Sequence, residues 1–392
     1  MSAHRTARRR LAPALVAAAF AASACASMVA PAQAAPVRPA PAQAAPAASV
    51  PVVANAATVA SIRGDGVPWK SVSQGWTLAE LTDRTGTQWY LVNPAGAHYR
   101  LGPKQVAGEL ADVSGDGQRA LFLDASRWPD QRVTVMTLKT RATTTFVRRF
   151  VSSARLTNPS GAQLLLVRAG FEGVPIDVEK RTLTGRLLRT YPQPATPGYS
   201  TVLPSMNGKK LVVTTRTGFR VYSDAGRLLR TIKTPSGYGQ CTPRTWWNGV
   251  LFAASCDAIA GGRSQVFLMS TDGAATRQLT RGDAQDSFWG YLTAWPTRRG
   301  VFVARVEECP SQGSGLLSAD GRRVQSFKAA RDAYPVAGAG DRIYYAFTMG
   351  CSVSGPGMRL VSYDVRTGRL LAIAGGYDRM EVGRYAVIDA AQ

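Results

Sequence analysis

Any acid–base chemistry in this sequence would depend on carboxylates, because the chain contains only two histidines, His4 and His98. Two carboxyl groups about 5–10 Å apart can hydrolyse a glycosidic bond. The acids in the segments between apolar runs are Asp130, Glu172, Asp283, Asp286, Glu307, Glu308 and Asp332. Glu307 and Glu308 are the most suggestive pair, yet neighbouring residues on a strand point to opposite faces. Loop acids are usually solvated, so we predict no catalytic residue and keep a carbohydrate-active hydrolase or lyase as the alternative.

One segment partly matches a calcium-binding loop. Residues 112–117 read Asp-Val-Ser-Gly-Asp-Gly, close to the D-x-[DN]-x-[DN]-G pattern. The glutamate that completes such a loop is missing downstream, and the serine at position 114 is a poor ligand. A β-turn in which glycine supplies a positive φ explains the same residues. We therefore expect no metal ion and no cofactor.

Aromatic side chains are the other candidates for contact with a ligand. An exposed ring beside an arginine can stack on a sugar or on a peptide side chain. The predicted ligand-binding residues are Trp128, Phe171, Tyr238, Trp246, Trp247, Phe288 and Trp289. For Trp246 and Trp247 the alternative is packing between structural units.

The elements that must position these residues follow a repeat. Seven turns with a small or polar pair, often followed by arginine and aliphatic residues, recur 41 to 48 residues apart. They centre on residues 96, 141, 185, 226, 273, 321 and 368. A second set of turn glycines repeats in phase: Gly115, Gly161, Gly208, Gly249, Gly300 and Gly340. Two independent markers with one period indicate a repeat architecture.

Short apolar runs follow the first turn of the repeats, such as Leu164–Val167 and Val301–Val303. They are continuous rather than alternating, as expected of strands covered on both faces. Four strands per repeat with glycine and aspartate turns predict an all-β fold, a seven-bladed β-propeller of four-stranded antiparallel blades. The first repeat lacks a strand, which Arg384–Asp389 can supply, so that the ring closes and both edges are covered. If that run instead starts another blade with part of residues 58–75, the ring has eight blades.

The turn sequences Ser114–Phe122 and Ser205–Leu211 resemble the S-P-D-G-x-x-apolar turns of TolB-type, WD40-like propellers. The proline of that pattern is replaced, and the Gly-His and Trp-Asp pairs of WD40 repeats are missing, so the resemblance is to the architecture. Cys241–Trp247 together with Ala254–Cys256 is also similar to a group of exported bacterial propellers of unassigned function. The resemblance covers residues 75–390 and implies no catalytic residues.

Four cysteines remain beyond the N-terminal segment, and an even number in an exported chain predicts two disulfides. Cys256, Cys309 and Cys351 lie at the exit of the second strand of their repeats, and Cys241 lies in the loop entering the same blade as Cys256. In a propeller these positions share one face. We therefore predict a Cys241–Cys256 bond within a blade and a Cys309–Cys351 bond between adjacent blades. A four-cysteine zinc site is the alternative, although CxxC spacing is lacking.

The N-terminus predicts export. A group of arginines (Arg5, Arg8, Arg9 and Arg10) precedes an apolar run, and Ala32-Gln33-Ala34 is typical of a cleavage site. Alternatively, Ala22–Cys25 acts as a degenerate lipobox, with a lipidated Cys25 that anchors the chain. No second apolar run approaches the length that spans a bilayer. The expected division is a signal peptide over residues 1–34, an Ala/Pro-rich disordered tether over 35–57 and the propeller over 58–392.

The chain carries a large positive charge. Its 47 basic and 25 acidic residues give a formal net charge of +22. Such a charge can steer a protein towards anionic partners. The basic residues are spread along the chain and no nucleic-acid-binding motif is present, so nucleic acid is not an expected partner. We predict a secreted, monomeric binding or scaffold module for a protein or an anionic cell-envelope polymer, with no transmembrane segment after signal removal.

Overall fold

The structure is a computed structural model. It describes residues 62–63, 66–83, 86–102, 106–168, 177–192, 201–259, 264–273, 276–280, 291–306, 314–318, 323–327, 333–347, 359–375 and 381–388. All of these residues belong to one compact unit, residues 46–392. The predicted signal peptide, the tether and Cys25 lie outside the described residues, so these assignments stay predictions.

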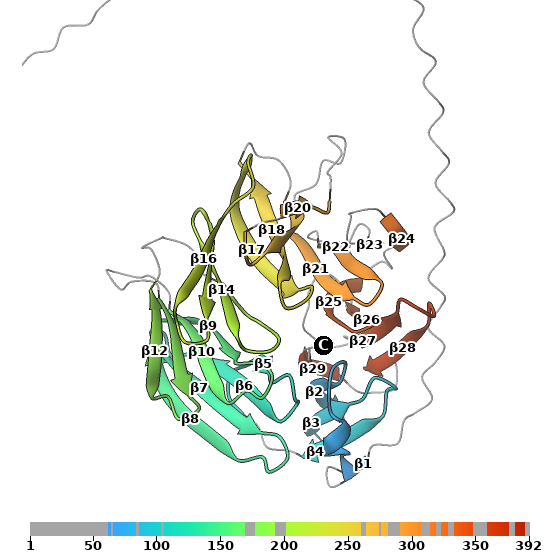
Figure 1. Cartoon of the computed structure of the whole chain (residues 1–392). Coiled ribbons are helices and arrows are strands. Elements are labelled where there is room, and N and C mark those ends of the chain that lie inside the picture. The colour runs from blue at the N-terminus through green and yellow to red at the C-terminus, as the bar shows by residue number, and fades with distance from the viewer. Residues whose placement is uncertain are drawn as a thin grey trace, which may run out of the picture. The chain divides into compact units, whose positions relative to one another are not determined.

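Antiparallel strands form seven sheets in a ring, a β-propeller (Figure 1). Blade 1 contains β2 (Thr77–Asp83), β3 (Gly86–Val92) and β4 (His98–Gly102). Blade 2 contains β5 (Glu109–Val113), β6 (Arg119–Asp124), β7 (Asp130–Thr137) and β8 (Thr143–Arg149). Blade 3 contains β9 (Val151–Leu156), β10 (Gln163–Arg168), β11 (Asp177–Thr182) and β12 (Leu187–Pro192). Blade 4 contains β13 (Val202–Pro204), β14 (Lys210–Thr215), β15 (Gly218–Ser223) and β16 (Leu228–Lys233).

The second half of the ring follows the same plan. Blade 5 contains β17 (Tyr238–Trp246), β18 (Leu251–Ala258), β19 (Gln265–Ser270) and β20 (Thr276–Gln278). Blade 6 contains β21 (Tyr291–Thr297), β22 (Gly300–Val306), β23 (Ser314–Leu317) and β24 (Arg323–Phe327). Blade 7 contains β25 (Ala333–Ala339), β26 (Arg342–Phe347), β27 (Arg359–Asp364) and β28 (Leu370–Ala374). The prediction of an all-β, seven-bladed propeller is confirmed, and the eight-bladed alternative is wrong.

The C-terminal strand closes the ring. β29 (Glu381–Val387) pairs antiparallel with β2, with Leu78 opposite Ala386, and so completes blade 1 as predicted. β1 (Ile62–Arg63) then adds a parallel strand outside β4, which the sequence did not predict. Among the described residues, the one helical element with assigned bounds is a 3₁₀ turn, η2 (Trp69–Ser71). The closure joins residues more than 300 positions apart in the chain.

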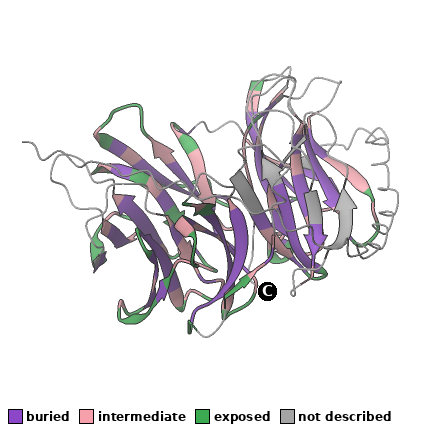
Figure 2. Ribbon diagram, turned by 90° about the horizontal axis from the view of Figure 1, so that it is seen from above, coloured by how far each residue is buried: buried purple, intermediate pink, exposed green. Residues whose placement is uncertain are grey.

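The core is divided among the interfaces between blades. The described residues contain seven hydrophobic clusters, and each lies where two neighbouring blades face one another. On β6, Phe122 joins the cluster towards blade 1 and Leu121 the cluster towards blade 3, and both are fully buried. The continuous apolar runs therefore reflect strands that pack on both faces, and Figure 2 shows this burial along the blades.

The first strand of each blade is an edge strand at the centre of the ring. In blades 2 to 7 this strand has a hydrogen-bonded strand on one side only, and in blade 1 the same position is taken by β29. Four of these strands contain proline: Pro204, Pro243, Pro296 and Pro335. Proline lacks the N–H that a second neighbour would need, so within sheets it is restricted to edges and bulges. These prolines are consistent with the position of their strands beside the channel.

In blades 3 and 4, the turn between the third and fourth strands contacts the blade before it. Gly185 and Gly226 have φ values of +87° and +78°, a conformation that favours glycine. A Cβ at Gly185 would lie 2.6 Å from Cγ of Phe146, and one at Gly226 would lie 2.4 Å from Cδ of Arg189. Both contacting side chains come from the outer strand of the preceding blade. The periodic glycine therefore serves the turn and also the spacing between blades.

Candidate ligand-binding face

One face of the ring, which we call the long-loop face, is formed by the loops between second and third strands and by the connections that enter each blade. The opposite turn face carries the tight glycine turns. Most of the predicted site residues lie outside the described residues: Phe171, Glu172, Asp283, Asp286, Phe288, Trp289, Glu307, Glu308, Cys309, Asp332 and Cys351. Their predicted roles stay predictions. The described parts of this face belong mainly to blades 2 and 5.

Blade 2 presents an aromatic and basic surface, the Trp128 patch, made of Trp128, Asp130, Arg149 and Phe150. The Trp128 side chain is 50% exposed and meets the Phe150 ring edge to face, with centroids 5.7 Å apart. The Arg149 guanidinium carbon lies 5.0 Å from the centre of the Phe150 ring. Asp130 Oδ1 lies 3.3 Å from Arg149 Nε. This is the combination of ring and guanidinium that the sequence predicted for a binding surface.

Backbone hydrogen bonds hold this patch in place. The turn before β7 begins where Asp124 Oδ1 accepts a hydrogen bond from Ser126 N at 3.0 Å. Phe150 N donates to Pro129 O at 2.9 Å, which joins the connection leaving β8 to the loop that carries Trp128. Phe150 has a φ of +62°, uncommon for a large side chain. Phe150 and Arg149 were not among the predicted site residues, although the run Arg148-Arg149-Phe150 beside a predicted loop places a ring next to two guanidinium groups.

A buried charge cluster lies between blades 2 and 3 and holds the end of β8. Arg148 donates to both carboxylate oxygens of Glu179 on β11, and Arg181 Nε donates to Glu179 Oε2 at 2.6 Å. Arg168 Nη1 donates to Asp177 Oδ2 at 3.2 Å. Burial would raise the pKa of Glu179, but the hydrogen bonds from Arg148 and Arg181 hold it below its usual value. Burial raises the pKa of Asp177 despite the charge of Arg168.

The adjacent residues Arg148 and Arg149 have different roles. Arg148 is directed into the interface between blades, where its ion pair with Glu179 is largely buried. Arg149 is directed outward, and its ion pair with Asp130 is more than half exposed. Alternation along β8 produces this split. The inner arginine fixes the strand, and the outer one is available at the surface.

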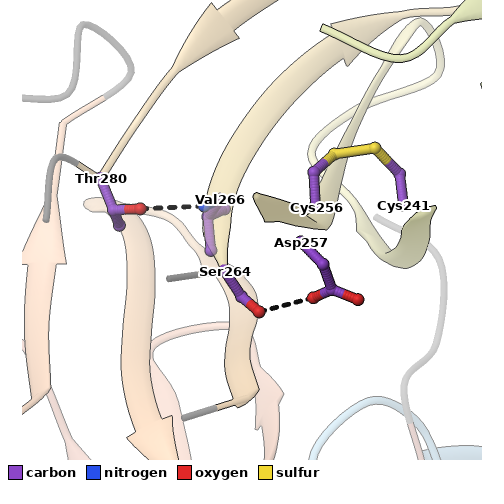
Figure 3. Close-up of a disulfide and its surroundings, with 6 residues drawn as sticks. All are labelled: Cys241, Cys256, Asp257, Ser264, Val266 and Thr280. Carbon is purple, nitrogen blue, oxygen red and sulfur yellow. Dashed lines mark hydrogen bonds between the residues drawn. A yellow bond between two sulfur atoms is a disulfide. The ribbon is translucent and has the colours of Figure 1, made fainter. Parts of the chain in front are cut away.

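Blade 5 is braced by a disulfide. Cys241 and Cys256 are direct cross-strand partners on β17 and β18, with Cα atoms 4.0 Å apart, and their sulfurs are bonded (Figure 3). The predicted Cys241–Cys256 bond within one blade is confirmed. Cys241 lies inside β17 rather than in the loop that enters the blade, because that strand is nine residues long.

Around the disulfide, side chains tie the strands of blade 5 together. Ser264 Oγ donates to Asp257 Oδ1 at 2.5 Å (Figure 3). Tyr238 packs on Phe267 with ring centroids 4.8 Å apart, and its hydroxyl accepts a hydrogen bond from Gln278 Nε2 at 3.3 Å. Ile259, in the loop after β18, is 71% exposed. Tyr238 is half-buried.

Trp246 and Trp247 pack on opposite sides of blade 5. Trp246 is 2% exposed, belongs to the cluster towards blade 4, and donates from Nε1 to Pro204 O at 2.9 Å. Trp247 is half-buried against the cluster towards blade 6. These contacts agree with the packing interpretation. The ligand-contact prediction for the aromatic set therefore depends most on Trp128 among the described residues.

The segment that partly matches a calcium loop forms a hydrogen-bonded turn. Ser114 Oγ donates to Asp116 Oδ1 at 2.6 Å, and Asp116 Oδ1 also accepts from Gln118 N at 3.0 Å. Asp112 Oδ2 accepts from Leu156 N of blade 3 at 2.8 Å. The oxygens that would ligate calcium are engaged in the turn and in the interface between blades. Within the described part of the chain, no group of three His, Cys, Asp or Glu residues has the geometry of a metal site.

The fold defines a class of protein, the seven-bladed β-propeller. No protein-family model matches the sequence, and no curated protein matches it significantly. Solved structures do match: a prolyl endopeptidase at 15% identity and a TM-score of 0.53, over 80% of this chain and 49% of that one. The present chain thus spans about half the length of that peptidase.

Two further structures are similar. The β-propeller domain of the Trilobed protease from Pyrococcus furiosus matches at 12% identity and a TM-score of 0.52, over 84% of this chain and 98% of that domain. TolB from Acinetobacter baumannii matches at 11% identity and a TM-score of 0.44, over 81% of this chain and 67% of TolB. The Pyrococcus domain is described as having an open velcro topology, whereas β29 closes the ring here. At these identities the matches with the prolyl endopeptidase and the Pyrococcus domain show the fold alone.

No helix among the described residues is both long and apolar enough to cross a membrane.

Proposed function

We propose that this protein is an exported binding module whose long-loop face holds a protein or an anionic polymer of the cell envelope. The observation that carries the proposal is the Trp128 patch. It places a half-exposed tryptophan, a second ring and an outward arginine on one surface. Tryptophan and arginine are the residue types that dominate binding energy in interfaces.

The charge of the chain favours an anionic partner. Removal of residues 1–34 would leave 43 basic residues against 25 acidic ones. The long-range field of such a chain raises the local concentration of anions. Arg149 is the basic member of the Trp128 patch, and its side chain faces outward. Binding that uses these charges should weaken as salt is added, because exposed charges are screened.

A hydrolase is the alternative, and the described contacts give it less support. A glycosidase needs two carboxyl groups close together across the substrate. Asp130 is the one predicted acid within the described residues, and it lies beside Arg149 in an exposed ion pair. That pairing suits a residue that orients the arginine of a binding surface. Release of reducing sugar from envelope polysaccharide by the purified protein would favour the alternative.

The test is capture of envelope fractions by the mature, oxidised protein at increasing salt concentration. Trp128→Ala and Arg149→Met should each lower retention of the captured partner, Trp128→Ala by about tenfold or more. Val250→Ala is the matched control, because Val250 is 45% exposed and lies on the turn face. Wild-type retention by both patch variants would contradict the proposal, and so would binding that is insensitive to salt.

A further inference from the structure

The outer strands of the blades form a rim with an unusual composition. In blades 2 to 7 the outer strands are β8, β12, β16, β20, β24 and β28, and in blade 1 β4 lies next to the outermost strand, β1. None of them contains an aspartate or a glutamate, although the chain has 25 acidic residues. They contain eight arginine or lysine residues: Arg100, Arg148, Arg149, Arg189, Arg230, Lys233, Arg277 and Arg323. Basic residues therefore occur on these strands in blades 1 to 6, and β28 of blade 7 has none.

Within this rim, two neighbouring blades carry the same exposed sequence. Residues 185–190 and 226–231 both read Gly-Arg-Leu-Leu-Arg-Thr. The four leucines are exposed by 47%, 37%, 47% and 38% for Leu187, Leu188, Leu228 and Leu229. Each arginine that precedes a leucine pair, Arg186 or Arg227, is exposed as well. We call residues 186–190 and 227–231 the rim repeats.

A third copy of the leucine pair, in blade 7, packs against the neighbouring blades instead of being exposed. In blade 7, Leu370 packs against the cluster towards blade 6, and Leu371 packs against the cluster towards blade 1. The corresponding leucines of blades 3 and 4 belong to none of the clusters found among the described residues. Large apolar side chains gathered on a surface mark sites of contact with a partner. The rim repeats are thus apolar positions that the ring itself leaves uncovered.

The register of the outer strands explains the difference. In β12 and β16 the pairing shifts at the leucine pair, which places the extra residue of a β-bulge at Leu188 and at Leu229. In β28 the shift comes later, at Ile373, so both leucines there stay in the regular ladder. A bulge redirects side chains and interrupts pairing at a sheet edge. The bulges turn the leucines of blades 3 and 4 outward.

The bulges and the positive charges of the outer strands indicate what kind of partner can bind there. Bulges and cations on an edge strand oppose addition of another strand, and like charges oppose contact with a second copy of this rim. The partner must therefore contact side chains rather than pair with the strand. It needs apolar groups to cover the leucines and anionic groups to bind the arginines. We propose that the rim repeats of blades 3 and 4 bind the surface of an anionic phospholipid bilayer. Leucines enter the boundary between headgroups and acyl chains, and Arg186 and Arg227 contact lipid phosphates.

The neighbouring positions of the two repeats make this binding effective. They occupy equivalent places on adjacent blades, and Arg189 of blade 3 donates to Ala225 O in the turn before the second repeat. One extended surface can therefore contact both. Two weak apolar contacts that act together bind a membrane far more strongly than one.

The experiment measures sedimentation of the mature protein with vesicles. The probes are vesicles of phosphatidylcholine alone and vesicles of phosphatidylcholine mixed with phosphatidylglycerol. We expect binding to the anionic vesicles and not to the neutral ones. Replacement of all four leucines by glutamine should reduce the partition coefficient about tenfold or more. Arg186→Gln with Arg227→Gln should reduce binding and flatten its dependence on salt.

Controls separate this inference from the function proposed above. Val250→Gln, another exposed apolar position, should bind vesicles as the wild type does, and so should Trp128→Ala. Wild-type partitioning by the four-leucine variant would overturn the inference, as would equal binding to neutral vesicles or no binding at all. A dimer seen by light scattering that the leucine variant loses would assign the rim to self-association instead. If the wild type binds polyphosphate but not vesicles, the rim would be assigned to a soluble anionic polymer instead.

Discussion

The turn face and the long-loop face of this propeller are built on different principles. On the turn face, contacts between the turns of neighbouring blades recur around the ring, although the groups differ: Asp116 N of blade 2 donates to Pro159 O of blade 3, and Arg299 Nη1 of blade 6 donates to Val365 O of blade 7. On the long-loop face the described contacts differ from blade to blade: blade 2 has the Trp128 patch, and blade 5 has a disulfide. The repeated contacts position the blades. The departures from the repeat give the surface its specificity.

The largest effect should come from breaking the closure on which both faces depend. Arg384 on β29 donates from Nε and Nη2 to the carboxylate of Glu80 on β2, and from Nη1 to Val106 O before blade 2. Its guanidinium also lies over Trp89. Both charged side chains are mostly buried. Arg384→Met leaves Glu80 buried without its partner, which should cost about 3–5 kcal/mol in the free energy of unfolding.

Denaturant titration of the mature protein measures this loss. The matched control is Arg149→Met, whose ion pair with Asp130 is exposed and should contribute at most about 1 kcal/mol. Adding Glu80→Gln to Arg384→Met should recover part of the stability, because the uncompensated charge is gone. Equal effects of Arg384→Met and Arg149→Met would show that the closure does not depend on this ion pair.

Removal of the disulfide should affect the long-loop face of blade 5 and leave the turn face of other blades unchanged. Cys241→Ala with Cys256→Ala removes a cross-link between residues 15 positions apart and should lower the free energy of unfolding by about 3 kcal/mol. Hydrogen exchange should rise in blade 5 near the disulfide, while the turn face of blades 2 and 3 keeps its protection. Uniform loss of protection over both faces would contradict the comparison. Peptide mapping without reductant also tests the predicted Cys309–Cys351 bond, which lies outside the described residues.

A glycine of the turn face should have the next largest effect. At Gly226→Ala the new Cβ meets Arg189 and the backbone has a φ of +78°, so the variant should be less stable by about 1–3 kcal/mol. Gly237→Ala is the matched control, because Gly237 has a φ of +84° and nothing within 4 Å of an added Cβ. The difference between the two melting temperatures isolates the contact between blades. Identical shifts would show that only the backbone conformation matters.

Much of the turn face could be predicted from the sequence, and the reason is physical. A glycine turn needs few residues, so the period of Gly185, Gly226 and Gly368 is visible without any contact information. The apolar runs that follow the first turns also became strands: Leu164–Val167 lies within β10 and Val301–Val303 within β22. The Cys241–Cys256 pairing also followed, because both residues lie in one repeat.

The long-loop face and the closure were predicted less well. The pairing of Arg384 with Glu80 spans 304 positions and exists only once the ring is closed. Glu179 forms ion pairs with arginines of both blade 2 and blade 3. No local sequence pattern predicts these contacts. Phe150 joins Trp128 through a positive φ that glycine usually adopts. Such features arise from tertiary context, so single-sequence periodicity does not report them.

The smallest effect concerns a buried histidine at the interface of blades 1 and 7. His98 begins β4, is 8% exposed and lies edge to face against the Tyr90 ring. Burial lowers its pKa from 6.5, and the nearby backbone of Ile373 on β28 opposes that shift. The folded protein therefore resists protonation of this ring. The unfolded chain does not.

This difference makes stability depend on pH in one direction. Below pH 6.5 the unfolded state binds a proton that the folded state excludes, so stability is full above that pH and falls as the pH drops below it. The loss approaches about 1.4 kcal/mol for each pH unit until the folded-state pKa is reached. Melting temperatures of the wild type and of His98→Phe between pH 7.5 and 5.5 measure it. Because the only other histidine is His4, in the predicted signal peptide, the difference between the two curves reports on this interface. If the curves ran parallel, His98 would be protonated equally well in the folded ring, and the turn face would be open to solvent where blades 1 and 7 meet.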